Sequence, residues 1–240
     1  DWNGLRRAGR VVRMTLDALE RHLRPGITTG ELDAVARRVL DADGARSAPA
    51  LVYGFPGTVL ISVNDEIVHG VPGPRRIAEG DLVKLDVTVE KNGYVADAAR
   101  TVAVGPPSDL AARLIASAEA AFHAGCAVAR AGTRVSEIGR AVDREVRRRG
   151  FAVVKGLTGH GVGRTIHEPP SVPNEYHPWQ RDILTEGLVL TIEPMVSAGT
   201  AQPVEDKNNW TIRTSDGSLS SHFEQTIVIT RDAPIVLTAA

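Results

Sequence analysis

The sequence predicts an α+β fold in which helices cover a curved, mostly antiparallel sheet made of two related halves. Stretches with helical periodicity alternate with β-branched stretches, and the order helix, helix, strands occurs twice. An Asn92-Gly93 pair between two of the β-branched stretches is a strong hairpin signal. We therefore expect a single domain, 1–240, with half-repeats at about 1–106 and 107–240 and a site between the halves.

In the first half, residues 1–22 place apolar side chains on one face, which predicts a helix. Arg24-Pro25-Gly26 follows and ends this helix. Thr28 stands three residues before Glu31, which predicts a capping box that opens a second helix running to about residue 43. Alternating β-branched residues then predict strands at 58–63, 81–90 and 93–104.

In the second half, helices are expected at 108–129 and 136–149, and strands at 152–155, 187–196, 210–213 and 225–230. The second helices of the two halves align with four identities, which supports an internal duplication: Gly26 with Gly132, Glu31 with Glu137, Arg38 with Arg144, and Gly44 with Gly150.

Composition limits the classes of function. With 42% hydrophobic and 24% charged residues the chain is typical of a soluble globular protein. Its net charge of -1 argues against nucleic acid as a substrate, and no apolar run approaches the roughly 20 residues of a membrane span. The lone Cys126 and the absence of a secretory pattern in residues 1–13 indicate the cytoplasm.

Four carboxylates occur where strands should be apolar: Asp86, Asp97, Glu193 and Glu224. A single carboxylate in a strand can be explained by exposure on a sheet face or by an arginine partner. Four such carboxylates on different strands make that explanation weaker. Together they could not lie dry and ionised without compensation, and two divalent cations would balance their charge. Ions bridged by carboxylates lie about 3.5–4 Å apart, as in two-metal hydrolytic sites.

Histidines complete the pattern. His160 lies among three glycines in 159–163, and His167 and His69 occur in similar Gly- or Pro-containing segments. Carboxylates with one or two imidazoles suit Mn, Co, Fe or Zn. The glycine-rich segment lacks the features of a phosphate-binding loop. The remaining histidines are expected to be structural or exposed: His22, His123, His177 and His222.

Five segments in this order resemble the type I methionine aminopeptidases, which have the pita-bread fold. They are 62–70, 86–97, 159–169, 191–195 and 223–226. The resemblance implies hydrolytic removal of the N-terminal methionine from nascent proteins and peptides by a water or hydroxide bridging two divalent metals (Co, Mn, Fe or Zn). It assigns Asp86 to one metal, His160 and Glu193 to the other, and Asp97 and Glu224 to both.

The same resemblance assigns catalytic roles to His69, His167 and Glu193, with both histidines also contacting the substrate. His167 would contact the scissile carbonyl, His69 the amine and scissile nitrogen, and Glu193 would carry a proton. The walls of the side-chain pocket should come from Val52, Phe55, Leu60, Ile166 and Trp210. Many family members have other residues at three of these pocket positions, which are Val52, Leu60 and Ile166 here. The same holds for Phe223 and Gln225, which flank Glu224. These changes could loosen the methionine preference or be neutral.

The resemblance further implies a monomer that meets nascent chains, with transient ribosome contact. Two alternatives remain. An X-Pro aminopeptidase or dipeptidase would share the five ligands, although such enzymes usually carry an additional N-terminal domain. A catalytically silent pita-bread binding protein would typically have lost ligands, whereas all five are present here.

Overall fold

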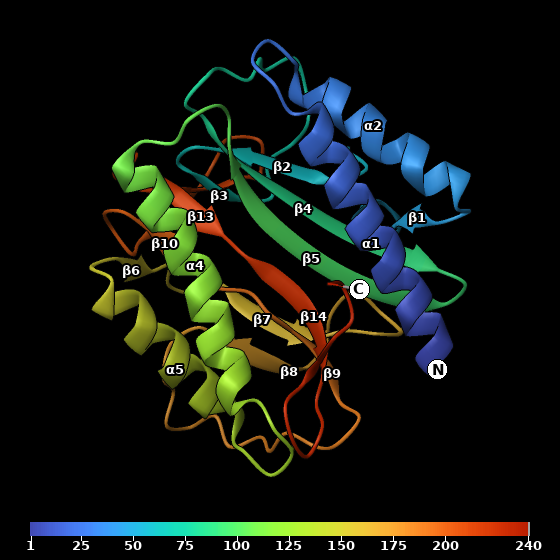
Figure 1. The fold of residues 1–240 in the computed structure, drawn as a ribbon, viewed down its shortest axis with the longest axis vertical. Helices are drawn as coiled ribbons and strands as arrows, with labels where there is room; N and C mark the ends of the chain where they lie inside the picture. Colours follow the sequence, from blue (N-terminus) through green and yellow to red (C-terminus); the bar gives the residue numbers. More distant parts are fainter. Residues whose placement is uncertain (240) are drawn as a thin grey trace.

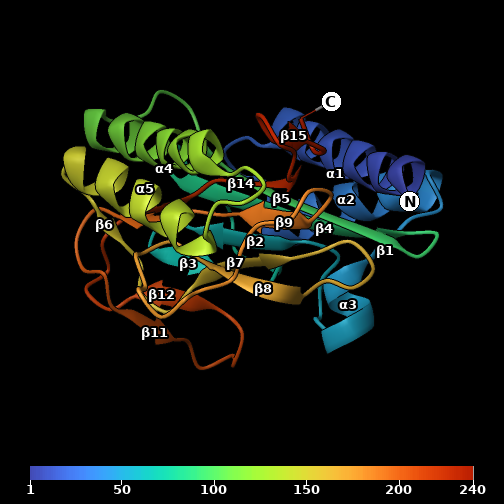
Figure 2. The ribbon, with the colours of Figure 1, turned by 90° about the horizontal axis from the view of Figure 1, so that it is seen from below.

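The computed structural model describes residues 1–239 and confirms the α+β class. Helix α1 (Trp2–His22) packs beside α2 (Thr29–Ala42), and α4 (Asp109–Val128) packs beside α5 (Val135–Arg148). Figures 1 and 2 show α1 and α4 lying over the same face of the central sheet, whereas the short helix α3 (Ala48–Tyr53) lies on the opposite face. Within residues 1–239 no helix combines the length and apolarity needed to cross a bilayer.

The central sheet has nine strands whose pairings are all antiparallel. Its main path runs β1 (Arg46–Ser47), β4 (Leu82–Lys91), β5 (Tyr94–Ala103), β14 (Glu224–Val228), β9 (Val189–Ile192), β7 (Thr158–Gly161) and β8 (Glu168–Pro173), with β2 (Leu60–Val63) beside β4 and β15 (Ile235–Val236) beside β14. Two three-stranded sheets flank it: β13 (Ser220–His222), β10 (Met195–Ser197) and β6 (Ala152–Val153), and β11 (Pro203–Glu205), β12 (Ile212–Thr214) and β3 (Glu66–Val68).

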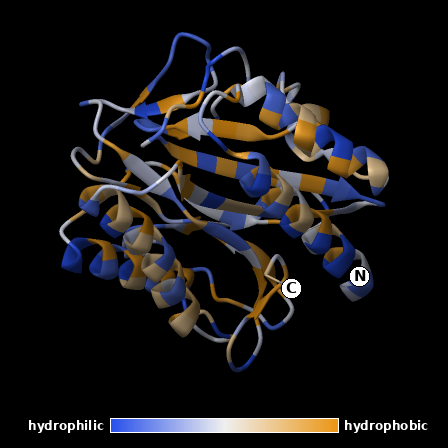
Figure 3. Cartoon of the chain, turned by 45° about the horizontal axis from the view of Figure 1, so that its top comes forward, coloured by the Kyte–Doolittle hydropathy of each residue, from blue (hydrophilic) through white to orange (hydrophobic). Residues whose placement is uncertain are grey.

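Apolar burial explains how each helix pair holds its half of the sheet. One core joins Val12 and Leu16 of α1 to Leu85 of β4, and a second joins Leu114 of α4 to Ile192 of β9. Hydrophilic and hydrophobic residues alternate along the helices in Figure 3, as expected for helices with one buried face.

The two halves correspond closely in their second helices. Helices α2 and α5 each have 14 residues and begin 106 positions apart, at Thr29 and Val135. The glycines before them have nearly equal positive φ angles, 88° at Gly26 and 89° at Gly132. Equivalent isolated bridges, Thr28 with Arg76 and Arg134 with Ile183, secure both helix starts. This correspondence supports the proposed half-repeats 1–106 and 107–240.

Most predicted helices and strands are present in the structure, and the predicted capping box of Thr28 and Glu31 opens helix α2. The expected strand at 187–196 is interrupted, because β9 ends at Ile192 and β10 begins at Met195. Pro194 lies in the gap and has no backbone N–H to donate to a ladder. The expected strands at 152–155 and 225–230 are shorter, at β6 and β14, and the expected strand at 210–213 is displaced to β12. Helix α3 and the short strands β1, β3, β7, β8, β11, β13 and β15 were not predicted.

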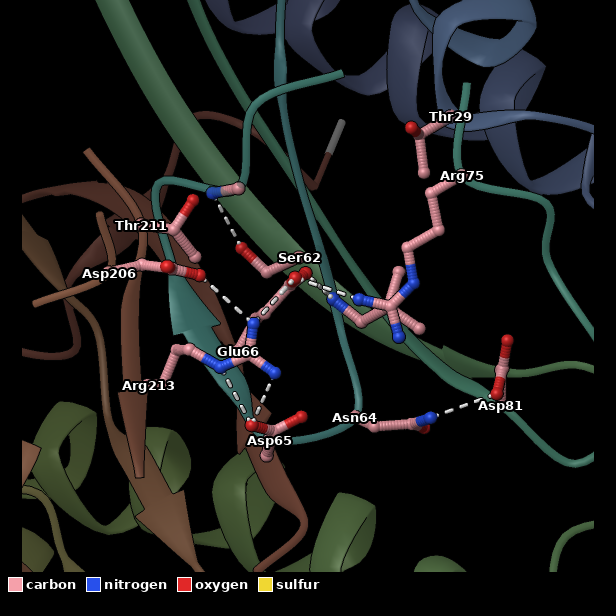
Figure 4. Close-up of polar contacts among 12 residues, drawn as sticks. Thr29, Ser62, Asn64, Asp65, Glu66, Arg75, Asp81, Asp206, Thr211 and Arg213 are labelled. Atoms are coloured by element: carbon pink, nitrogen blue, oxygen red, sulfur yellow. Dashed lines mark hydrogen bonds and ion pairs between the residues drawn. The ribbon is translucent and has the colours of Figure 1, made fainter. Parts of the chain in front are cut away.

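The turn between β2 and β3 is held by a polar cluster (Figure 4). Arg213 of β12 forms ion pairs with Asp65 at 2.8 Å and Asp206 at 3.0 Å, and Arg75 pairs with Glu66 at 2.7 Å. The Gly70 N–H donates to Ser62 Oγ at 2.9 Å. The ion pairs hold the start of β3, and the Gly70 bond holds the segment just after His69.

Gly70→Ala is expected to lower the free energy of unfolding by about 3 kcal/mol, because the new Cβ would overlap neighbouring backbone. An ideal Cβ there lies 2.1 Å from Ile61 O and 2.6 Å from Ile61 C. Gly73→Ala is the matched control, since no heavy atom lies within 4 Å of its Cβ. Urea unfolding of both variants measures the effect, and equal stability of the two would contradict it.

Candidate active site

The four carboxylates predicted from the sequence come together on one face of the central sheet. Asp86 and Glu224 both lie opposite Ala99 of β5, in the same row of the sheet, one on each side of that small residue. Asp97 lies opposite Thr88, two residues from Asp86, so Asp86 and Asp97 are diagonal neighbours. Glu193 follows β9, where the interruption at Pro194 leaves its side chain beside this row.

Two histidines approach these carboxylates at similar spacing. His160 of β7 places Nε2 3.4 Å from Glu193 Oε1 and 3.9 Å from Asp97 Oδ2. His222 of β13 places Nε2 3.8 Å from both Glu193 Oε2 and Glu224 Oε2. The ligand atoms form two groups that share Glu224: one with Asp97 and His160, and one with Asp86 and His222.

Burial and mutual repulsion make this cluster unfavourable for ionised carboxylates. Burial, followed by neighbouring carboxylates, holds the pKa of Asp86, Glu193 and Glu224 well above its usual range. Burial raises the pKa of Asp97 to about 6, opposed by the hydroxyl of Thr88. Within residues 1–239 no lysine or arginine forms an ion pair with any of the four, which excludes the arginine-partner interpretation.

The cluster fits divalent cations. Asp97 Oδ1 and Glu224 Oε1 are buried and have no hydrogen-bond partner among the described residues. Two ligand atoms that share a cation at about 2.0–2.2 Å are separated by about 3–3.5 Å, close to the spacings from His160. A set of carboxylates and imidazoles can therefore bind one or two such ions here.

A cavity of about 610 Å³ opens onto the cluster. Its walls include the expected pocket residues Phe55, Leu60, Ile166 and Trp210, and the rings of Phe55 and Trp210 meet edge to face at 5.2 Å. Val52 does not line the cavity and is 55% exposed, which corrects the expectation for this residue. Pro49 and Tyr53 line it instead, because they share one face of helix α3 at i, i+4 spacing.

His69 and His167 lie in the cavity wall on the open side of the carboxylates. His69 has a φ of 60°, unusual for a residue with a Cβ, and burial followed by the His167 charge lowers its pKa. Burial, followed by the His160 charge, lowers the pKa of His167. The Tyr53 hydroxyl is hydrogen-bonded to His167 Nδ1, a contact the sequence did not reveal.

His222 also departs from expectation, because it was grouped with structural or exposed histidines. It is only 1% exposed, and burial lowers its pKa to about 3, so the ring is neutral. His222 and Glu224 are two residues apart along nearly continuous strands, and alternate residues of a strand face the same side. That spacing was the available signal. His22, His123 and His177 lie away from the cavity.

Comparisons with known proteins agree with this geometry. The model of metallopeptidase family M24 matches residues 3–231. Methionine aminopeptidase 2 of Bacillus subtilis is 42% identical over 237 residues, covering 98% of this chain and 95% of that protein. The methionine aminopeptidase of Clostridium perfringens is 41% identical over 234 residues, covering 98% of this chain and 94% of that protein.

Solved structures show the same similarity. The methionine aminopeptidase from Rickettsia prowazekii superposes with a TM-score of 0.95 at 34% identity, covering 99% of this chain and 96% of that one. Prolidase from Pyrococcus furiosus superposes with a TM-score of 0.80 at 23% identity, but this chain covers only 63% of it. The second match shows a shared fold alone.

Proposed function

This chain belongs to metallopeptidase family M24 and has its pita-bread fold, and from that premise we propose that it hydrolyses the N-terminal methionine from peptides and nascent proteins. The observation that carries the proposal is the buried carboxylate–histidine cluster at the floor of a cavity of about 610 Å³. A cavity of this size admits one side chain rather than a folded segment, which suits removal of a terminal residue.

We propose two divalent ions in this cluster, drawn from Co, Mn, Fe or Zn. Asp86 would bind one ion, His160 and Glu193 the other, and Asp97 and Glu224 both. Support comes from the two ligand groups that share Glu224 and from the need to balance four carboxylates. When bound, such ions supply Lewis-acid polarisation and an activated water nucleophile.

The remaining chemistry falls to residues of this chain. A peptide would present its free α-amine to the metal-loaded cluster, and this requirement restricts hydrolysis to the terminal residue. His167 donates a hydrogen bond to the scissile carbonyl oxygen, and His69 lies near the scissile nitrogen. Glu193 accepts a proton and passes it to the leaving amine. Phe55, Leu60, Ile166 and Trp210 surround the methionine side chain and exclude water from it.

Tyr53→Phe is expected to lower kcat roughly tenfold with little change in KM, because Tyr53 orients His167. In the proposed role the phenol donates to Nδ1, which would place the proton of the neutral ring on Nε2, from which it can be donated to the carbonyl oxygen. Steady-state kinetics on a methionyl peptide measure the effect. Val52→Ala on the exposed face of the same helix is the control, and equal kcat values for the two variants would contradict the role.

A matched peptide panel tests the proposed function. Metal-free protein receives Mn or Co and is offered Met-Ala-Ser, its Leu- and Ala-initiated relatives, a Met-Pro peptide and an X-Pro peptide. Faster, metal-dependent release of methionine is expected. Preference for the X-Pro peptide would favour the dipeptidase alternative, and no hydrolysis with any metal would favour the binding-protein alternative.

The cellular setting remains part of the proposal. An enzyme acting on nascent chains would work in the cytoplasm as a monomer with transient ribosome contact. The single catalytic domain 1–240 would have its site between the half-repeats. This is supported by the cluster itself, which draws Asp86 and Asp97 from the first half and His160, Glu193 and Glu224 from the second.

A further inference from the structure

His222 lies inside the carboxylate cluster but has no role in the ligand set proposed above. Its side chain is 1% exposed, and neither ring nitrogen has a hydrogen-bond partner within the described part of the chain. Leaving a buried polar group unpaired destabilises the folded state. The His222 ring is therefore buried at an energetic cost that no hydrogen bond within the described residues offsets.

The surroundings of His222 match those of His160. The Nε2 atom of His160 lies 3.4 and 3.9 Å from its two nearest carboxylate oxygens, and that of His222 lies 3.8 Å from each of its two. The two His160 distances and the distance from His222 to Glu224 exceed a hydrogen bond but are close to the separation of atoms that share a cation. Glu193 lies equally near His222 but belongs to the other ion in the proposed ligand set. Asp86, His222 and Glu224 offer ligand atoms within 4.8 Å of one another.

The position of the ring is fixed by its backbone. The His222 N–H donates to Thr101 Oγ1 at 2.8 Å, and the Thr101 hydroxyl donates to the His222 carbonyl, also at 2.8 Å. On the other side of the strand, His222 pairs with Met195 of β10. The imidazole is therefore held beside Asp86 and Glu224 before any ion arrives, as expected of a preorganised ligand.

We propose that His222 is an additional imidazole ligand at the Asp86–Glu224 end of the metal centre. Each of the two ions then has one imidazole, His160 on one and His222 on the other. This inference rests on the two-ion centre of the proposed function and extends it. An imidazole shifts an all-oxygen site toward Fe, Co or Zn and strengthens binding of the second ion.

Calorimetric titration of metal-free protein with Co²⁺ tests the proposal. His222→Gln is expected to weaken one of the two binding steps by about tenfold or more and to leave the other nearly unchanged. The visible Co²⁺ spectrum of the same samples should change with the loss of a nitrogen ligand. The control is His123→Gln, because the His123 side chain is 65% exposed. Equal affinities and spectra for wild type and His222→Gln would overturn the proposal.

A crystal structure of the Co²⁺-loaded wild-type protein provides a second measurement that needs no variant. The expected distance from His222 Nε2 to an ion is about 2.0–2.3 Å, and a distance beyond about 3 Å would overturn the proposal.

The titration also separates the role of His222 from the two-ion centre itself. Two ions bound equally by wild type and His222→Gln would refute only the role of His222, whereas no binding by wild type would refute the metal centre as well.

Discussion

Replacing Glu193 with glutamine is expected to lower kcat for methionyl peptides by more than about 100-fold while leaving the fold intact. The substitution keeps the size and shape of the side chain but removes its negative charge. The fold should survive because the Thr191 hydroxyl, which donates to Glu193 Oε1 at 2.9 Å, can donate equally to an amide oxygen. The loss should be large because one group would act both as a metal ligand and as the proton carrier.

Kinetics at saturating Mn or Co measure this effect, so that weakened metal binding is not mistaken for lost chemistry. Glu186→Gln is the control, since that side chain is 55% exposed and pairs with Arg231 at 2.8 Å. Circular dichroism should show the same secondary structure in both variants. Near-normal turnover by Glu193→Gln would contradict the proposed chemistry, whatever its metal content.

The helices and the four carboxylates of the site could be predicted from the sequence. The helices follow from apolar periodicity and a capping box, because these signals are local and are repeated over several turns. The four carboxylates were readable because a charged residue inside a β-branched stretch must be compensated. Asp86 is the clearest case, with apolar residues on both sides of it in β4.

Other features depend on contacts between distant segments. Strands of two or three residues, such as β1 and β13, have no periodicity to detect. Val52 and Tyr53 were not distinguished because the six-residue helix α3 was not predicted, and the face of an element cannot be assigned before the element is known. The bond between Tyr53 and His167 joins residues 114 positions apart. The two-residue spacing from Glu224 was the local signal for His222, but its approach to Glu193 depends on the pairing of β13 with β10.

The metal-free protein offers a second large effect, a pH dependence of stability that metal reverses. The pKa of Glu193 is raised in the folded state by burial and then by Asp97. A carboxyl group of this kind stabilises the fold fully below its unfolded pKa, near 4. That stabilisation is lost as the pH rises through the higher folded pKa. Each unit of difference is worth about 1.4 kcal/mol.

The informative quantity is the difference in Tm between Glu193→Gln and wild type, both stripped of metal. His69, His160, His167 and His222 have lowered pKa values and contribute the opposite trend, but they are common to both proteins. The variant lacks the titrating carboxyl group and relieves repulsion on Asp86 and Glu224. Its advantage in Tm should therefore grow from about pH 5 to pH 8.

Saturating Mn or Co should reverse the order, because ions bind the ionised carboxylates of the folded state only. Ligand at 100 times its Kd adds about 2.7 kcal/mol, and wild type should bind more tightly than Glu193→Gln. Scanning calorimetry at three pH values, with chelator and with metal, measures both effects. A Tm difference independent of pH in chelator would show that these carboxylates are already solvated or paired without metal, which would remove the electrostatic reason for placing ions among them.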